Sequence, residues 1–446
     1  MKNNLEDIVK RYTSTIKNLK LNNIKIAVTG LSRAGKSVFL TSLIDQLLHQ
    51  DKIEGISLSN QAFKVTLKAP SSSVKRFDYY TLIDRLKNEH IWPKGTDEIS
   101  HTILEIESKS RFSFMDNSKF NIELIDYPGE WLLDLSLLNI EFEDWSKKTL
   151  SWLKDIDDEL AQEYLKMVYS LDKTAHGKDI ELNLHNKYKE LLIHLKKEHY
   201  SQLTPGRFMI PSDLANDPIL HFAPVDKDTK RLNKIFQERY NRYVNEVVRD
   251  IHLEHFKGFK RQIVLIDVVE ALQNGYKCYS DMKAGLRTML HLYDYKNKNF
   301  FAKWFSPSIN RVIFVASKAD LVASSQHANF SMLLDDMIDD IRREMDISHI
   351  KTDTQIIASL KSTVTIEKKY EGMKLSFVRG ILEEDSLLHD IYPGEMPSKF
   401  PSKEEWNRDN YGYKSFLPPK KSYRDNESLE HINMDKLIKK LIGDLL

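Results

Sequence analysis

The sequence has a single cysteine, Cys278, among its 446 residues, and it has no long apolar run. One thiol cannot close an intrachain disulfide or build a Cys-rich metal site, so the chain does not need an oxidising compartment. No window approaches the roughly 18 apolar residues of a membrane-spanning helix. The first twenty residues are charged throughout and lack the apolar stretch of a signal peptide. We therefore expect a cytoplasmic protein without a transmembrane segment, which could reach a membrane peripherally or through a partner.

An excess of charge of one sign is also missing. The chain has 66 Lys and Arg against 65 Asp and Glu, which gives a formal charge of +1. Without bulk positive charge, no nucleic-acid partner is expected. The 15 histidines include no His-x-x-x-His pair, so we expect no zinc site. At roughly 100–200 residues per domain, the length allows two or three domains, or one core with a large insertion.

Glycine is scarce, with 15 residues in the chain, yet two glycines frame a complete phosphate-loop pattern, Gly30-Leu-Ser-Arg-Ala-Gly-Lys-Ser37. A chance match in a chain of this length and composition is roughly 1%. A strand-like run precedes the motif and a helical run follows it, which is the order that phosphate binding needs. The glycines let backbone N–H groups face phosphate oxygens, Lys36 would bridge the β- and γ-phosphates, and Ser37 would bind Mg²⁺.

A second metal carboxylate is expected at the end of a neighbouring strand. The run Phe120–Ile125 alternates like a strand and continues into Asp126-Tyr-Pro-Gly129. Asp126 can hold Mg²⁺ through water, and the Gly129 N–H can approach a γ-phosphate. A second alternating run begins at Thr102, and the polar stretch around Asp116-Asn117 suits a hairpin turn between the two strands.

The third element is Ser317-Lys-Ala-Asp320, which directly follows the apolar run Arg311–Ala316. A carboxylate at this strand end can accept two hydrogen bonds from the N1–H and N2–H₂ edge of guanine, whereas adenine offers no such pair of donors. The motif therefore favours GTP over ATP, although Asp320 alone could equally be an ordinary helix start. The hydroxyl of Ser317 can brace the phosphate loop.

In this order the three elements resemble the motifs of Ras-like GTPases, and the chain as a whole resembles the YcjX-like family of bacterial stress-associated P-loop GTPases. That resemblance is carried by Gly30-LSRAGKS, Asp126-YPGEW, Arg261-QIVLID, Arg311-VIFVASKAD and Asn433-MDKLIKKLIGDLL. It implies an α/β fold: a Ras-like P-loop GTPase core, with a mostly parallel sheet flanked by helices, and a large helical insertion. The expected division is an N-terminal helix (1–21), a core (22–130 and 260–380), a helical insertion (131–259) and a loop-rich segment ending in a helix packed on the core (381–446).

The resemblance also implies GTP or GDP with Mg²⁺ as cofactors. By position, the expected phosphate contacts are Gly30, Ser32, Arg33, Ala34, Gly35, Lys36, Ser37 and Val38. The expected base contacts are Lys318, Asp320, Leu321, Ser359 and Leu360, the last two through backbone N–H groups near guanine O6.

A GTPase also needs a hydroxyl from its first switch to complete the Mg²⁺ shell when the γ-phosphate is present. Thr96 is the candidate, with Ser100 and Thr102 as alternatives. Trp92 could cover the ribose or base with its indole face, or it could pin a loop onto the core.

For hydrolysis, the position after the Gly129 motif is Glu130, where many small GTPases have glutamine. An ionised carboxylate only accepts hydrogen bonds, so slow intrinsic turnover is expected. Arg33 could contact the γ-phosphate as an internal arginine finger, or it could be solvated or pack on the sheet. Glu130 could equally be a first-turn acid at a helix start.

The leading hypothesis is a slow regulatory GTPase, with a protein effector that reads the switches through the helical insertion. A P-loop ATPase or nucleotide-dependent kinase, and a scaffold with a structural nucleotide, are the alternatives.

Overall fold

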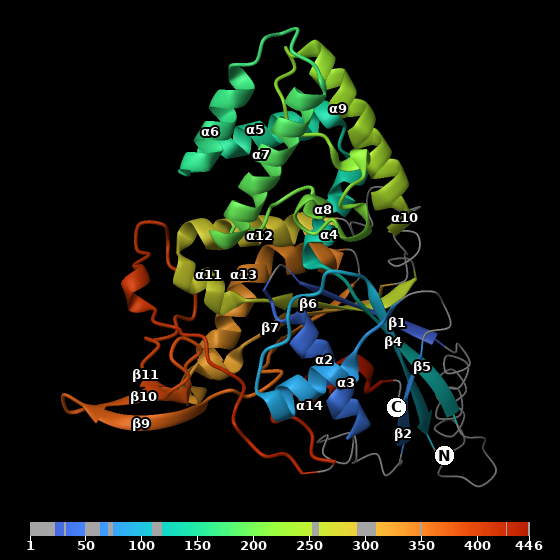
Figure 1. The fold of residues 1–446 in the computed structure, drawn as a ribbon. Coiled ribbons are helices and arrows are strands. Elements are labelled where there is room, and N and C mark those ends of the chain that lie inside the picture. The colour runs from blue at the N-terminus through green and yellow to red at the C-terminus, as the bar shows by residue number, and fades with distance from the viewer. Residues whose placement is uncertain are drawn as a thin grey trace. The chain divides into compact units, whose positions relative to one another are not determined.

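The computed structural model describes residues 23–30, 33–49, 63–69, 75–108, 118–251, 258–291, 309–347, 350–424 and 426–444. These residues form two compact units (Figure 1). One contains the described residues of 1–127, 258–279 and 307–446, and the other those of 128–257 and 280–306. The predicted N-terminal helix, Ser32 and the Asp116-Asn117 turn lie outside the described residues. The division into N-terminal helix, core, helical insertion and C-terminal segment that the sequence predicts stays a prediction.

The first unit is built on an eight-stranded sheet in the order β2-β4-β5-β1-β6-β7-β8, with β3 paired to β4. Strands β5, β1, β6, β7 and β8 are parallel, whereas β4 is antiparallel to β5 and to β2. The strands are β1 (Asn23–Gly30), β2 (Phe63–Lys68), β3 (Lys75–Arg76), β4 (Ser100–Ser108), β5 (Ser118–Asp126), β6 (Phe259–Ile266), β7 (Arg311–Ala316) and β8 (Lys351–Ile356). Strands β6 and β7 are apolar along most of their length because both faces of the sheet are covered.

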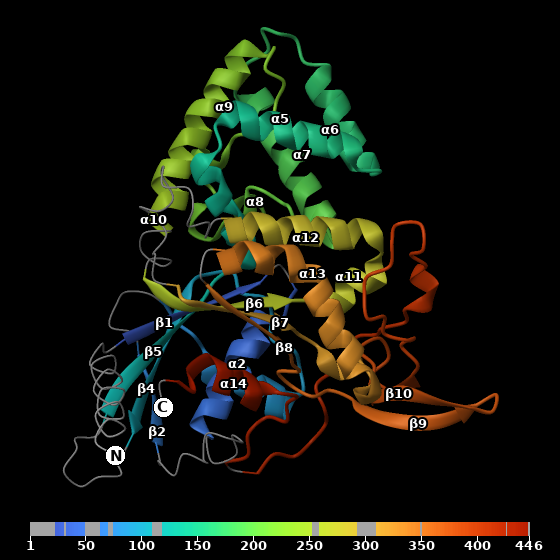
Figure 2. The same cartoon turned by 180° about the vertical axis from the view of Figure 1, so that it is seen from behind.

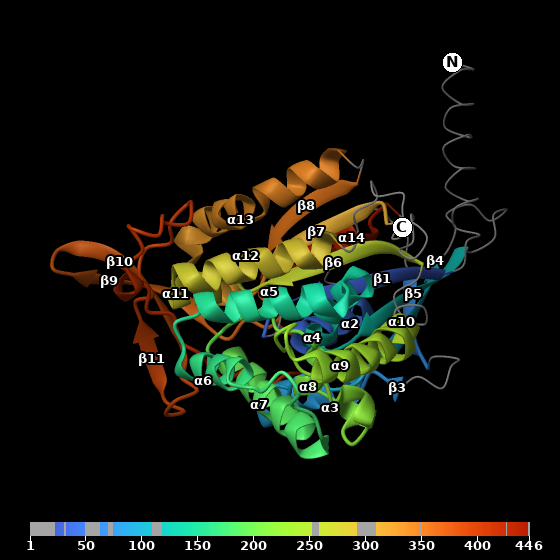
Figure 3. The ribbon, with the colours of Figure 1, turned by 90° about the horizontal axis from the view of Figure 1, so that it is seen from above.

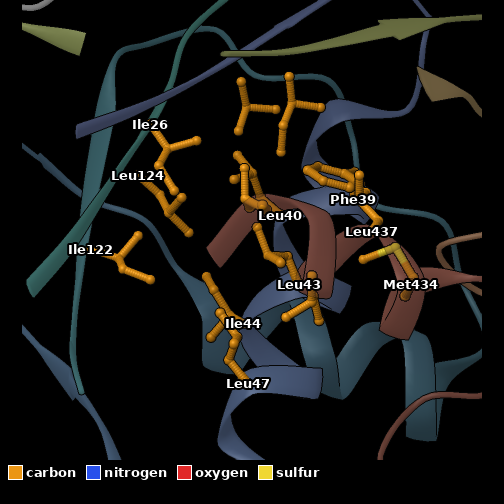
Figure 4. Close-up of a cluster of buried hydrophobic side chains, with 14 of the residues drawn as sticks. Ile26, Phe39, Leu40, Leu43, Ile44, Leu47, Ile122, Leu124, Met434 and Leu437 are labelled. Atoms are coloured by element: carbon orange, nitrogen blue, oxygen red, sulfur yellow. The ribbon is translucent and has the colours of Figure 1, made fainter. Parts of the chain in front are cut away.

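Helices flank this sheet on both sides. Figures 1 and 2 show α2 (Lys36–Leu48) and α14 (Met434–Ile442) on one face, and α11 (Val268–Asn274) and α13 (His327–Ile347) on the other. Figure 4 shows side chains of β1, β5, α2 and α14 meeting in one apolar cluster. In that cluster Leu43 and Leu437 are completely buried. The α/β class with a mostly parallel sheet, compatible with a Ras-like P-loop core, is thereby confirmed.

A separate three-stranded antiparallel sheet was not predicted. It runs in the order β11-β10-β9 and consists of β9 (Val364–Tyr370), β10 (Met373–Ile381) and β11 (Leu388–Ile391). Glu371 and Gly372 join the first two strands with φ values of 49° and 81°, the left-handed geometry of a tight hairpin turn. Val378 of β10 packs with Leu382 and Phe416, which ties this sheet to the chain that follows it.

The second unit is helical. Its helices are α4 (Gly129–Asp134), α5 (Phe142–Asp155), α6 (Glu159–Tyr169), α7 (Lys178–Lys197), α8 (Gly206–Met209), α9 (Lys230–Arg242), α10 (Arg249–Ile251) and the larger part of α12 (Tyr276–His291). Figure 3 shows α5, α6, α7 and α9 seen from above. Its core is aromatic: Trp145 stacks on Tyr240 with ring centroids 5.4 Å apart, and Phe222 packs edge-on against both.

Two shorter helices complete the first unit around the nucleotide motifs. Helix α3 (Tyr79–Asp84) continues into a π-helical turn at Arg85–Glu89, and the chain then runs to β4 without regular secondary structure. This stretch carries Trp92 and Thr96. Among the described residues, no helix is long and apolar enough to cross a membrane.

Candidate functional site

The phosphate loop connects the end of β1 to the start of α2. A Cβ on Gly30 would lie 2.9 Å from the Leu265 carbonyl oxygen, so only glycine lets β1 approach β6 this closely. Arg33 and Gly35 have φ values of 66° and 80°. Gly35 is the N-cap residue of α2, so no N-cap side chain occupies the N–H groups at the start of this helix. No acidic residue lies in the first turn of α2. Its first N–H groups can therefore bind an anion.

Three hydroxyl and carboxylate groups meet beside this loop. The Thr96 hydroxyl donates to Asp126 Oδ2 at 2.6 Å, and Ser37 Oγ lies 2.9 Å from Thr96 Oγ1. Thus α2, the stretch before β4 and the end of β5 each contribute one oxygen. The alternative Ser100 lies opposite Asp126 in the strand register, and the alternative Thr102 has a buried hydroxyl without a hydrogen-bond partner in the described structure.

Asp126 is only 3% exposed. Burial raises the pKa of its carboxyl above the usual value, while Lys36 and the Thr96 hydrogen bond oppose that shift. Its second oxygen, Oδ1, is buried and has no hydrogen-bond partner among the described residues. Carboxylate and hydroxyl oxygens are the donors that Mg²⁺ prefers. The three residues therefore fit the metal that the motifs predict.

The ion would rely on few protein ligands. The described part of the chain contains no group of three or more His, Cys, Asp or Glu side chains that could hold a metal. Mg²⁺ generally takes one or two carboxylates and completes its shell with water and substrate phosphates. Lys36, from the first turn of α2, lies 5.7 Å from the ring centroid of Tyr127, next to Asp126.

A pocket of about 250 Å³ is lined in part by the phosphate loop and the first turn of α2. Nine predicted nucleotide contacts line it: Ala34, Gly35, Val38, Trp92, Lys318, Asp320, Leu321, Ser359 and Leu360. Five further residues complete the lining: Ser317, Ser362, Glu383, Ser415 and Phe416. Glu383, Ser415 and Phe416 come from the C-terminal segment 381–446. This segment was expected to be rich in loops, and none of its residues was predicted to belong to the site.

The carboxylate of Asp320 is 7% exposed and is held by the loop after β8. The backbone N–H of Ser362 donates to Asp320 Oδ2 at 2.9 Å, and the Ser362 hydroxyl donates a second hydrogen bond at 2.5 Å. Burial raises the pKa of Asp320, and these two bonds oppose the shift. The two hydrogen bonds from Ser362 hold the Asp320 carboxylate, a hydrogen-bond acceptor, in the lining of the pocket. The role of Ser362 was missed because no spacing rule links it to Asp320.

Ser317 differs from the expectation. Its hydroxyl lies 3.4 Å from the Ile266 carbonyl oxygen and donates to it, rather than bracing the phosphate loop. The reason is that β7 runs beside β6, so the residue after β7 meets the end of β6.

Trp92 pins a loop, as one of the two roles considered for it requires, and its contact with a base or ribose stays a prediction. Its indole N–H donates to the Phe416 carbonyl oxygen at 2.7 Å, which pins the stretch before β4 to the C-terminal segment. The same side chain packs against Leu86, Leu360 and Leu429 and lines the pocket.

The two candidates for hydrolysis have structural partners. Arg33 Nη1 lies 3.5 Å from Glu270 Oε1 of α11. Glu130 is in the first turn of α4, is 8% exposed and forms an ion pair of 2.5 Å with Lys196 of α7. A Cβ on Gly206 would lie 2.3 Å from the Glu130 carbonyl oxygen, so the chain is closely packed around this residue. Glu130 and Gly129 belong to the second unit, whereas Asp126 belongs to the first.

Comparison with known proteins gives a consistent result. A family model described as "YcjX-like family, DUF463" matches residues 24–446. The curated relatives include a "Ras-like GTPase YcjX" of Escherichia coli (strain K12), 31% identical over 470 residues that cover 100% of this chain and 99% of the relative. A protein of the same name from Shewanella oneidensis (strain MR-1) is 29% identical over 482 residues, covering 99% and 98% of the two chains.

The buried charge of Asp126 predicts a measurable effect on stability. Because its pKa is raised in the folded protein, folding favours the protonated form, and metal-free protein loses stability as the pH rises from the usual 3.8 through the raised pKa. Asp126→Asn should therefore raise the free energy of unfolding at pH 7, by on the order of 1 kcal/mol for each unit of pKa elevation.

This gain should shrink as the pH falls and Asp126 becomes protonated. Urea unfolding with a metal chelator at pH 7 and pH 5 measures it. Asp390→Asn is the control, because Arg379 and Lys368 lower the pKa of Asp390 and its removal should not stabilise the protein. An Asp126→Asn variant that is less stable than the wild type at pH 7 would contradict the conclusion that burial raises the pKa of Asp126.

Proposed function

The chain belongs to the YcjX-like family, and on that premise we propose that it binds GTP and GDP with Mg²⁺ and acts as a slow regulatory GTPase that converts GTP to GDP and phosphate. The observation that carries the proposal is the meeting of Ser37, Thr96 and Asp126 beside the first turn of α2. The three come from segments that the sequence motifs had assigned separately to the phosphate loop, the first switch and the second metal carboxylate.

The phosphate end of the site follows from these contacts. The N–H groups of the loop and of the first turn of α2 bind phosphate oxygens, and Lys36 adds a positive charge. Bound Mg²⁺ would neutralise charge on the β- and γ-phosphates. Ser37 and Asp126 would hold it in both nucleotide states, whereas Thr96 would join only while the γ-phosphate keeps its segment in place. Hydrolysis would then release the stretch that carries Thr96.

The base end supports guanine. Asp320 faces the pocket with its carboxylate held by Ser362, and a fixed carboxylate can accept from both N1–H and N2–H₂ of guanine. Trp92 and Phe416 supply apolar walls of the same pocket. Adenine has an unprotonated N1 and no amine at C2, so it could not donate these two hydrogen bonds to the Asp320 carboxylate.

Slow turnover is part of the proposal. Glu130 is engaged by Lys196, and Arg33 by Glu270, so neither is free to act at the γ-phosphate in this arrangement. An effector or activator that rearranges either pair would accelerate hydrolysis. The helical unit is the proposed reader of the switches for a protein partner, and the family resemblance extends the proposal to a role in a bacterial stress response.

Guanine selectivity tests the proposal directly. Competition against fluorescent GDP should give micromolar or tighter binding of GDP and GTP, with no displacement by ATP or ADP. Asp320→Asn should weaken GDP binding by about 2–4 kcal/mol, which is roughly 30- to 800-fold, because two charge-assisted hydrogen bonds are affected. Asp217→Asn, at a helix cap in the helical unit, is the control. Equal competition by ATP would instead support an ATPase or kinase.

The first switch gives a second prediction. Thr96→Ala should weaken Mg²⁺-dependent binding of a non-hydrolysable GTP analogue by about tenfold or more and leave GDP binding nearly unchanged, because its hydroxyl would join the metal only in the triphosphate state. Thr102→Ala removes the hydroxyl of the other threonine considered for this role. It should leave the ratio of the GTP-analogue affinity to the GDP affinity as in the wild type. If Thr102→Ala changes that ratio and Thr96→Ala does not, the assignment of the switch ligand is wrong.

A further inference from the structure

We propose that Asp267, which no motif assigned to the site, is the residue that positions Lys318 against the nucleotide base. The inference rests on the proposed function, because it concerns the base end of the same site. It starts from the geometry at the ends of two neighbouring parallel strands. Ile266 ends β6 opposite Ala316 at the end of β7, so Asp267 and Ser317 begin the two adjacent loops at one edge of the sheet.

Asp267 is 3% exposed, and both of its carboxylate oxygens are used. Oδ1 accepts the N–H of Glu270 at 3.0 Å and so caps α11, while Oδ2 accepts a short hydrogen bond from Lys318 Nζ. A buried carboxylate that loses its cation is strongly unfavourable. The ion pair therefore fixes the end of the Lys318 side chain.

Lys318 itself is held in an unusual conformation. Its φ is 61°, in the left-handed region that residues with a side chain rarely adopt. Hydrogen bonds on both sides enforce this turn, from Ser317 N to the Ile266 oxygen at 3.1 Å and from Ala319 N to the Ile357 oxygen at 2.9 Å. The side chain is 41% exposed and lines the pocket. With its ammonium group anchored on Asp267, its alkyl chain forms part of the pocket wall.

This arrangement prepares the base site before the ligand arrives. A lysine side chain has four rotatable bonds, and ordering it during binding would oppose association. Asp267 orders it beforehand, and α11 in turn is fixed by Trp406, whose indole N–H donates to the Leu272 carbonyl oxygen at 3.1 Å. Among the described residues, the Asp267 side chain hydrogen-bonds to Lys318 and to the Glu270 N–H, and its link to the phosphate loop is indirect, through the ion pair of Glu270 with Arg33. Asp267 should therefore affect nucleotide affinity and leave the chemical step alone as long as the cap on Glu270 is kept.

The test uses the full-length protein with Mg²⁺, and it measures GDP and GTP binding and GTP turnover. Asp267→Asn keeps the helix cap, since Asn caps as well as Asp, but it removes the charge that holds Lys318. We expect GDP and GTP affinity to fall by the same factor, about tenfold, or ~1.4 kcal/mol. KM for GTP should rise while kcat stays unchanged, and Asp267→Glu, which keeps the charge for Lys318 but caps α11 less well, should recover part of the loss.

Asp158→Asn is the matched control. Asp158 also caps a helix, accepting from Ala161 N at 3.0 Å, and pairs with a basic side chain, His194, at 2.7 Å, but it lies in the helical unit. It should leave nucleotide affinity unchanged. In a Lys318→Met background, Asp267→Asn should have no further effect. If Lys318→Met alone fails to fold, the split between KM and kcat and the rescue by glutamate decide the question without it.

Two results would overturn the inference while leaving the proposed function intact: selective GDP binding by the wild type with an unchanged affinity in Asp267→Asn, or a fall in kcat that accompanies the rise in KM. A wild-type protein that binds ADP as well as GDP would overturn the proposed function, and the inference with it. The two failures are therefore distinguishable.

Discussion

The hydrogen bond from the Thr96 hydroxyl to the buried carboxylate of Asp126 is the interaction on which the rest of the site depends. It joins the stretch before β4 to the end of β5, and Ser37 extends the connection to the first turn of α2. Asp126 is nearly inaccessible, and one of its oxygens has no hydrogen-bond partner in the part of the chain that the structure describes, which is an unfavourable state for a carboxylate in a folded core. Such a group is understandable where a cation belongs, and the phosphate loop beside it accounts for an anionic ligand that would bring one.

The surrounding fold holds these segments in register through helix α2. Asp45, fully buried near its C-terminal end, accepts hydrogen bonds from Lys87 Nζ at 3.0 Å and from Leu429 N at 2.6 Å. Ser42 donates to the Ser359 carbonyl oxygen at 2.6 Å. One helix thus contacts the chain leading to the first switch, the C-terminal segment and the loop beside the base pocket.

Local patterns predicted the parts of the site that lie at strand ends. The loop Gly30–Ser37, Asp126 and Asp320 follow apolar strands directly, and parallel strands bring their carboxyl ends to one edge of the sheet. Alternating or apolar runs also predicted the strands β1, β4, β5 and β7, whereas β2 and β3 were not predicted. Thr96 could be named only as one of three hydroxyls, because local patterns do not say how the ten residues between the π-helical turn and β4 fold back.

Long-range pairings were beyond such patterns. Phe416 lies more than 300 residues after the phosphate loop in the sequence. It reaches the pocket because it pairs with Leu382, directly after the end of β10. The hairpin β9–β10 was not predicted, although apolar and polar residues alternate over parts of both strands beside Glu371-Gly372. Asp267 appeared as the end of a strand, and its partner Lys318 became visible only from the pairing of β6 with β7.

The central claim concerns where a divalent ion is held when triphosphate is bound, and the most direct measurement is a crystal structure with Mn²⁺ and a non-hydrolysable GTP analogue, in which anomalous scattering locates the metal. Manganese accepts the same oxygen ligands as magnesium. The account predicts one Mn²⁺ peak bonded to the hydroxyl oxygens of Ser37 and Thr96, with Asp126 beside it and the guanine against Asp320. A metal peak away from these three residues, or Thr96 turned away from the metal in that complex, would contradict it.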